Sequence, residues 1–351
     1  MAVPPLPRPR TAPGLVRRPY SARAPERQAR TRRAAGRERG ASSPRDKPPP
    51  YAGEPGTVRR TSRHRTLAGY AQTVPGTGSG TEGGAEVGLG TVITWWGHAT
   101  CTVEDSGVRV LTDPVFVRRL AHLRRRLGPV PPPEATVADA VLVSHLHSDH
   151  LHPRSLARLA PGTRLILPRG ADRSVPSLRR LDARRNPAGL RIAEVDAGDE
   201  VEIGALRVRA VPADHDGRRL PVGPHRSPAL GYVISGESRT YFAGDTGLFD
   251  TMADVVGPVD VALLPVGGWG PHLGPHHLDA GRAAQALAQL APRAAVPVHF
   301  GTYWPIGLDG VRPHEFYAPG DEFVRKAATL APEVTVHLLR HGESVRPGAV
   351  L

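Results

Sequence analysis

Three histidines and an aspartate follow a short apolar run near the middle of the chain. The run occupies residues 141–143, and the polar residues after it are His145, His147, Asp149 and His150. Imidazole and carboxylate groups are the ligands that zinc and similar borderline metals prefer. A β-branched apolar run of this kind predicts a buried strand, and strand ends are where α/β folds place their chemistry. The sequence therefore predicts a metal site at this point.

Four further residues of the same chemical types stand at the ends of other predicted strands or in the loops after them. They are His98 in WWGHAT, His215 in VPADH, Asp245 in FAGDT and His299 in VPVHFGTY. Together with the first cluster they are numerous enough to hold two metal ions. Two divalent ions about 3.5 to 4 Å apart can share a hydroxide that is a strong nucleophile near neutral pH. These residue types therefore favour hydrolysis.

The elements that would position these residues follow a regular order. From residue 91 the pattern predicts an antiparallel meander over 91–96, 97–104 and 108–114, with a turn at 105–107. Later strands are expected at 141–143, 164–168, 191–195, 200–203, 206–212, 229–235, 239–243, 259–264, 294–298 and 334–339. Helices are expected at 153–159, 170–182 with an interruption at Pro176, 248–256, 278–291 and 320–330. Both halves run from strands alone to strands alternating with helices, which predicts an α/β (α+β) fold of two face-to-face sheets with helices outside.

Two long segments between these elements are expected on the surface. Residues 115–135 include arginines 124–126 and prolines 131–133, and they are predicted to form a long loop. The apolar residues and arginines of this loop leave open a peripheral contact with a membrane. Residues 266–275 are rich in glycine and are expected to form a flexible rim, with Trp269 in the core or the wall of a pocket.

The order of the motifs resembles the metallo-β-lactamase superfamily over about residues 90–345. The shared pattern is His-x-His-x-Asp-His at 145–150, a lone histidine at 215, Gly-Asp-Thr at 244–246 and a last histidine at 299. Gly-His-Ala-Thr at 97–100, Leu-Thr-Asp-Pro at 111–114 and His-Phe-Gly-Thr at 299–302 are similar to one branch of it. That branch contains the L-ascorbate-6-phosphate lactonase-like proteins and the N-acylphosphatidylethanolamine-hydrolysing phospholipase D. The resemblance implies a four-layer αββα sandwich with a metal site at one edge.

The resemblance also implies how two ions would be held, most readily Zn²⁺, with Mn²⁺ or Fe²⁺ as alternatives. One ion is expected at His145, His147 and His215, a second at Asp149, His150 and His299, and Asp245 is expected to bridge both. Loss of Asp149 or Asp245 should cost the most activity. The implied reaction is hydrolysis of a phosphodiester, ester or lactone bond in a small or phospholipid-like substrate. The alternative left open is a metal-binding protein without catalysis, or one using iron or manganese for another reaction.

Four more residues are expected to act around the ions. His277 and Tyr303 are candidates for proton transfer to the leaving group or for contact with the substrate. Asp113 is expected to orient a ligand imidazole, as outer carboxylates do at such sites. His98 is expected either to act in the same outer layer or to contact the substrate.

The net positive charge of the protein is confined to the start of the chain. Residues 1–80 hold 17 of the 46 Lys and Arg residues and 4 of the 33 Asp and Glu residues, so they carry the whole net charge of +13. This segment has too few apolar residues to offset the entropy of ordering it. Residues 1–88 are therefore predicted to be a disordered tail, and residues 89–351 a hydrolase domain. The neutral remainder argues against nucleic acid as a partner; the alternative is a nuclease-type enzyme or nucleic-acid binder whose basic tail holds the strand.

Cysteine content and hydropathy indicate the cellular compartment of the protein. Cys101 is the one cysteine, so no disulfide can form within the chain. No stretch approaches the roughly 18 apolar residues of a membrane span, and no apolar signal core follows the first arginines. These features predict a cytoplasmic protein without a transmembrane segment.

Overall fold

The computed structural model describes residues 90–220, 226–270 and 272–347. The predicted tail, residues 1–88, lies outside these residues. In the part of the chain that the structure describes, no helix combines the length and apolar character needed to cross a membrane.

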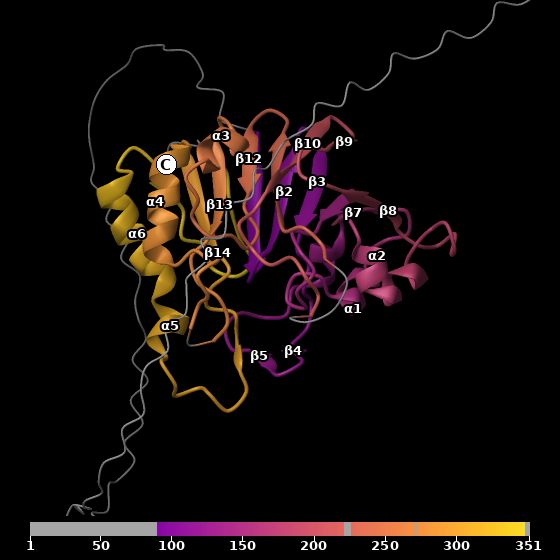
Figure 1. Ribbon diagram of the computed structural model, residues 1–351, viewed down its shortest axis with the longest axis horizontal. Coiled ribbons are helices and arrows are strands. Elements are labelled where there is room, and N and C mark those ends of the chain that lie inside the picture. The colour runs from indigo at the N-terminus through magenta and orange to yellow at the C-terminus, as the bar shows by residue number, and fades with distance from the viewer. Residues whose placement is uncertain (1–89, 221–225, 271, 348–351) are drawn as a thin grey trace, which may run out of the picture. The chain divides into compact units, whose positions relative to one another are not determined.

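Two mixed sheets, each of seven strands, form the centre of the fold (Figure 1). The first sheet has the order β17 (Glu343–Val345), β1 (Val92–Gly97), β2 (Thr100–Asp105), β3 (Val108–Thr112), β6 (Ala140–Leu142), β7 (Arg164–Pro168) and β8 (Arg191–Val195). The second has the order β16 (Thr335–Val336), β14 (Ala294–Val298), β13 (Val261–Pro265), β12 (Arg239–Phe242), β11 (Leu230–Ser235), β10 (Leu206–Pro212) and β9 (Glu200–Ile203). The predicted meander β1–β2–β3 is confirmed, and the first sheet continues from β3 to β8 with parallel pairs. The second sheet repeats this change, since β9 to β12 are antiparallel and β12 to β16 are parallel.

Helices cover the outer faces of both sheets. They are α1 (Pro153–Leu156), α2 (Ala171–Ser174), α3 (Met252–Val256), α4 (Ala280–Leu290), α6 (Pro319–Leu330) and the short 3-10 turns η1 (Pro133–Thr136) and η2 (Pro176–Arg180). The short helix α5 (His314–Tyr317) instead packs its Phe316 ring against Trp304. Figure 1 shows α4 and α6 on one side of the two sheets and α1 and α2 on the other. One apolar cluster, which includes Trp95, Ile234 and Val296, lies between the sheets, and two more lie under the helices. The predicted αββα sandwich is therefore confirmed.

The parallel strands are buried on both faces. All three residues of β6 and all five of β13 are buried, because helices cover one face of each sheet and the other sheet covers the opposite face. Such strands read as continuous apolar runs, which explains the pattern at residues 141–143. Polar side chains are then placed after the strand ends, at the edge of the sandwich.

The prediction of one long loop over residues 115–135 was wrong. The segment contains β4 (Arg119–Leu120) and β5 (Leu123–Arg125), and β5 pairs with β15 (Tyr303–Pro305) in a third, small sheet. Leu120, Leu123 and Tyr303 are buried together in an apolar cluster of their own. Strands of two or three residues leave no periodic signal, and the partner of β5 lies about 180 residues away in the chain.

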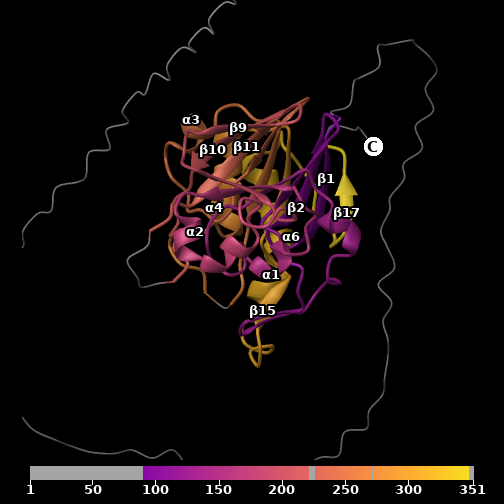
Figure 2. The ribbon, with the colours of Figure 1, turned by 90° about the vertical axis from the view of Figure 1, so that its right-hand side faces the viewer.

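Other differences occur near the C-terminal end. The sequence did not predict β15, β17 or α5, and the strand expected at 334–339 is confined to β16. Figure 2 shows β17 beside β1, which it joins as an antiparallel edge strand. Pairing between segments so far apart cannot be read from local periodicity.

Asp105 connects the two sheets at their turns. Its carboxylate accepts hydrogen bonds from the backbone N–H groups of Glu237 (2.8 Å) and Ser238 (3.1 Å), which lie in the turn between β11 and β12. The Thr91 hydroxyl donates to it over 2.6 Å. Burial raises the pKa of the Asp105 carboxyl, but hydrogen bonds from Thr91, Ser106 and the turn outweigh this effect and lower the pKa below its usual value.

We expect Asp105→Ala to lower the free energy of unfolding by about 3 kcal/mol, because it leaves buried donors without an acceptor. A carboxyl with a lowered folded-state pKa stabilises the fold above its unfolded value of about 3.9, and this contribution is lost as the pH falls through the folded-state pKa. Urea denaturation at pH 7 and at lower pH measures both effects. Asp250→Ala is the control, since Asp250 is exposed and has no hydrogen bond among the described residues. A deficit for Asp105→Ala no larger than that of the control would contradict the prediction.

Candidate metal centre

The residues predicted as ligands gather at one edge of the sandwich, after the ends of four strands. His145, His147, Asp149 and His150 lie in the loop after β6, His215 follows β10, Asp245 follows β12 and His299 follows β14. Both sheets contribute, because the parallel strands of each end at this edge. The structure therefore brings all seven predicted residues into groups whose ligand atoms lie within 4.8 Å of one another.

The first group consists of His145, His147 and His215. The Nε2 atom of His145 lies 2.9 Å from Nδ1 of His147, and Nε2 of His215 lies 3.3 Å from the same atom. His145 is fully buried, whereas His147 and His215 are partly exposed. Three imidazole nitrogens thus converge on one point near the protein surface.

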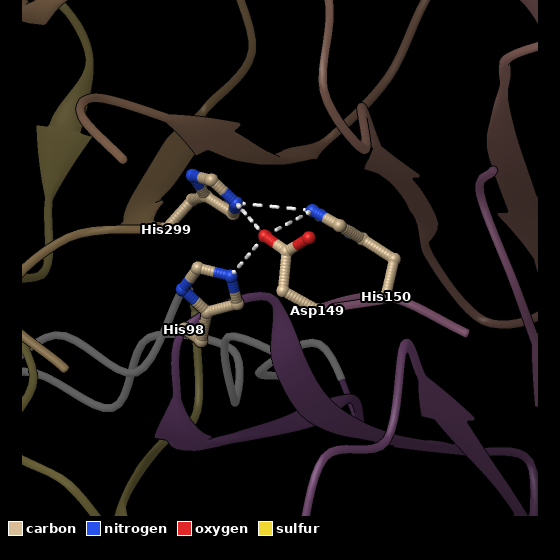
Figure 3. A group of neighbouring side chains, drawn as sticks. All are labelled: His98, Asp149, His150 and His299. Carbon is tan, nitrogen blue, oxygen red and sulfur yellow. Dashed lines mark hydrogen bonds and ion pairs between the residues drawn. The ribbon is translucent and has the colours of Figure 1, made fainter. Parts of the chain in front are cut away.

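The second group contains Asp149, His150 and His299, and His98 joins it (Figure 3). The Nε2 atoms of His150 and His299 are 3.0 Å apart. They lie 3.5 and 3.7 Å from Oδ2 of Asp149, which is 2.9 Å from Nε2 of His98. Figure 3 shows the Asp149 carboxylate between the three imidazole rings.

Asp245 lies between the two groups. Its Oδ2 atom is 4.0 Å from Nε2 of His145 and 3.3 Å from Nε2 of His150, and its Oδ1 atom is 3.3 Å from Nε2 of His299. Among the residues that the structure describes, Oδ1 has no hydrogen-bond partner although it is buried. A carboxylate in this place can contribute one oxygen to each group.

The outward nitrogen of most of these rings is held by an acceptor. Nδ1 of His150 lies 2.7 Å from the Asp113 carboxylate, Nδ1 of His299 lies 3.0 Å from the carbonyl oxygen of Gly267, and Nδ1 of His215 lies 2.9 Å from the carbonyl oxygen of His276. Carboxylate and carbonyl oxygens only accept, so Nδ1 carries the proton in each ring. The inward Nε2 of a neutral ring then presents a lone pair, as metal-ligating histidines do.

The pKa values of the buried carboxylates and histidines also depend on how closely these groups are packed. Burial alone would raise the carboxyl pKa of Asp149 and Asp245, but the surrounding histidines outweigh it and hold both pKa values well below their usual range. Burial lowers the pKa of His145 to well below its usual value, whereas Asp245, Asp149 and Asp113 outweigh burial at His150 and raise its pKa well above the usual value. Buried carboxylates require positive charge beside them, which a protonated His150 or a divalent ion can supply, and the donor set fits divalent metal ions.

The outer residues predicted from the sequence have different places. The Asp113 carboxylate contacts His150, as expected for a residue that orients a ligand, and it also accepts from the Ser144 backbone N–H over 2.7 Å. Nε2 of His277 lies 3.5 Å from Oδ2 of Asp245. The Tyr303 hydroxyl instead donates to the Val117 carbonyl oxygen over 2.6 Å, with the residue buried. This engagement argues against Tyr303 as a proton donor.

Two residues of the site have no signal in the sequence. Nη1 of Arg219 donates to the carbonyl oxygens of Leu146 (2.9 Å) and Leu151 (2.7 Å), so it holds the loop that carries the first four predicted ligands. The indole Nε1 of Trp269 donates to Oδ2 of Asp149 over 2.9 Å. Neither residue type is a metal ligand, and only the folded chain brings them to the loop after β6.

We expect Asp113→Asn to weaken metal binding by about 10-fold to 100-fold, the usual effect of losing an outer partner of a ligating histidine. An asparagine keeps the size of the side chain but offers a single acceptor oxygen, where the carboxylate serves both Ser144 and His150. Competition with a chromogenic chelator measures the change. Unaltered affinity in a folded variant would show that Asp113 does not orient His150.

Known proteins are similar to this chain in sequence and in fold. Residues 108–300 match the model of the Beta-lactamase superfamily domain. A metal-dependent hydrolase from Methanopyrus kandleri is 31% identical over 259 residues, covering 72% of this chain and 98% of the relative. The N-acyl-phosphatidylethanolamine-hydrolyzing phospholipase D 1 of Caenorhabditis elegans is 30% identical over 239 residues, covering 62% of this chain and 65% of that protein. The solved structure of Igni18, a metallo hydrolase from Ignicoccus hospitalis, is 24% identical, covers 73% of this chain and 97% of its own, and has a similar fold with a TM-score of 0.53.

The family model spans more than half of the chain, and the archaeal relative is matched over nearly its whole length. The resemblance inferred from the order of the motifs is thereby confirmed. With its histidine and aspartate groups at the edge of an αββα sandwich, the chain belongs to the β-lactamase superfamily and is a metal-dependent hydrolase.

Proposed function

We propose that this protein uses two divalent metal ions, most readily zinc, to hydrolyse a phosphodiester, ester or lactone bond in a small or phospholipid-like substrate. The observation that carries the proposal is the position of Asp245. Its two oxygens face histidines of both groups, within 3.3 Å of His150 and His299 and 4.0 Å of His145. A single ion would occupy one group of converging donors and leave the other group without an ion to bind.

The residues divide the chemistry among them. Two divalent ions, when bound, would lower the pKa of a water molecule and act as Lewis acids toward the substrate. Asp149 and Asp245 supply the negative charge that holds the two groups together, and the buried histidines exclude bulk water from them. His277 lies beside Asp245 with 26% of its side chain exposed, so it can reach both the site and an incoming substrate. We assign it the transfer of a proton to the leaving oxygen.

The rim of the site supports an amphiphilic substrate. Trp269 is 36% exposed and contacts His122 edge to face, with ring centroids 5.0 Å apart. The carbonyl oxygen of His122 accepts a hydrogen bond from Ile306, which is 42% exposed. The partly exposed Trp269 ring thus lies next to the Asp149 carboxylate, and Ile306 is bonded to the residue that Trp269 contacts. The name of the relative from Caenorhabditis elegans, a phospholipase D, favours the phosphodiester within this range, although this chain covers 65% of that protein's length.

We expect chelation to abolish hydrolysis of a panel of phosphodiesters, esters and lactones, and added zinc or manganese to restore it. Asp245→Ala should lower kcat/KM on the order of 10³-fold, because metal ions contribute several kcal/mol to stabilising the transition state. Asp250→Ala serves as the exposed carboxylate control. The proposal fails if no member of the panel is turned over, or if the metal-free protein and Asp245→Ala are as active as the wild type.

His277→Gln should lower kcat on the order of 10²-fold, the contribution of a positioned general acid, while leaving the metal content unchanged. Glutamine keeps a polar side chain of similar reach but cannot transfer a proton. Steady-state kinetics combined with elemental analysis of the purified variant separates the two effects. A variant that loses metal together with activity would instead identify His277 as a ligand, and unchanged kcat would remove it from the reaction.

A further inference from the structure

Trp269 lies in the loop between β13 and α4, and this loop follows a tight path over the second group. The carbonyl oxygen of Gly267 accepts from Nδ1 of His299 over 3.0 Å. At Gly268, a Cβ atom would lie 2.7 Å from the Leu273 side chain and 3.8 Å from the His299 ring. The backbone at Gly267 and Gly268 therefore passes close to the His299 ring.

The indole N–H of Trp269 points at a ligand oxygen. Nε1 donates to Oδ2 of Asp149 over 2.9 Å, and Nε2 of His98 lies 2.9 Å from the same oxygen. A carboxylate oxygen only accepts, so Nε2 of His98 carries the proton in this contact and donates to Asp149. Two N–H donors from distant segments therefore hold the Asp149 carboxylate. The loop after β13 thus supplies an outer hydrogen bond to two members of the second group, Asp149 and His299.

The indole is braced from outside by the small third sheet. Its ring meets His122, in the turn between β4 and β5, at an interplanar angle of 74°. The carbonyl oxygen of His122 accepts from the backbone N–H of Ile306, directly after β15, over 2.9 Å. Trp269 is 36% exposed, so burial of apolar area does not by itself account for its place. The contacts on both sides fix the direction of its N–H bond.

We propose that Trp269 is a positioning residue of the metal centre, which holds the Asp149 carboxylate in place and thereby sets the affinity of the second group for its ion. The inference rests on the proposed function in one respect, namely that the second group binds an ion. An outer hydrogen bond fixes the rotamer of a ligating carboxylate, and its loss usually weakens metal binding 10-fold to 100-fold. Only the second group should respond, because Trp269 makes no hydrogen bond to His145, His147 or His215 among the described residues.

Trp269→Phe removes the N–H and keeps an aromatic ring against His122. Trp96→Phe is the matched control, because Nε1 of Trp96 donates to Thr102 Oγ1 over 2.7 Å, and so this change also removes one indole hydrogen bond. The full-length metal-free proteins are titrated with zinc against a competing chelator. We expect two ions in the wild type and in Trp96→Phe. In Trp269→Phe one of the two ions should bind about 10-fold to 100-fold less tightly, with the affinity for the other unchanged.

Tryptophan fluorescence during the same titration gives a second readout that needs no substrate. Binding of an ion at the second group should change the fluorescence emission of the wild type and of Trp96→Phe. This change should be absent in Trp269→Phe. The inference is overturned if Trp269→Phe binds both ions within about 2-fold of the wild type, or if it weakens both ions equally. If the wild type binds fewer than two ions, the proposed function fails together with the inference; two ions with an unaltered Trp269→Phe variant overturn the inference alone.

Discussion

Three carboxylates are buried at one edge of the sandwich, and the surrounding structure compensates for their charge. Asp113, Asp149 and Asp245 are each at most 5% exposed. A buried carboxylate is costly unless it is paired and hydrogen-bonded, and each of these lies within 3.3 Å of a histidine nitrogen. The carboxylates raise the pKa of His150 and His299, so these two rings can carry compensating positive charge as protons. A divalent ion would take the place of those protons, and this need for positive charge is the physical basis of the proposed metal centre.

The geometry of that edge comes from the sheets. In each sheet the change from antiparallel to parallel pairing brings several strand ends to the same edge. Bonds between the sheets then fix how those ends face one another. The His299 backbone N–H donates to the His98 carbonyl oxygen over 2.8 Å, and the Leu230 N–H donates to the Ser144 carbonyl oxygen over 2.9 Å. The packed backbone therefore sets the positions of the candidate ligands.

The small third sheet supports the site from outside. Tyr303, in β15, packs with Leu120 and Leu123 and donates its hydroxyl to the Val117 carbonyl oxygen. Its ring meets the His98 ring edge to face at 5.4 Å. Tyr303, which the sequence suggested for proton transfer or substrate contact, thus packs the third sheet against His98. Residues 115–135, expected to be a loop, supply the other strands of that layer.

The sequence by itself determined the αββα architecture and the set of candidate ligand residues, because both rest on local information. Buried parallel strands must read as apolar runs, and the polar residues that follow them, such as His145 and Asp245, stand out by type and position. Only the tertiary structure decided which groups surround those ligands. The positions of three side chains depend on hydrogen bonds between segments that are far apart in the chain: Arg219, Trp269 and Tyr303. Such bonds form when the sheets pack, and no spacing along the sequence records them.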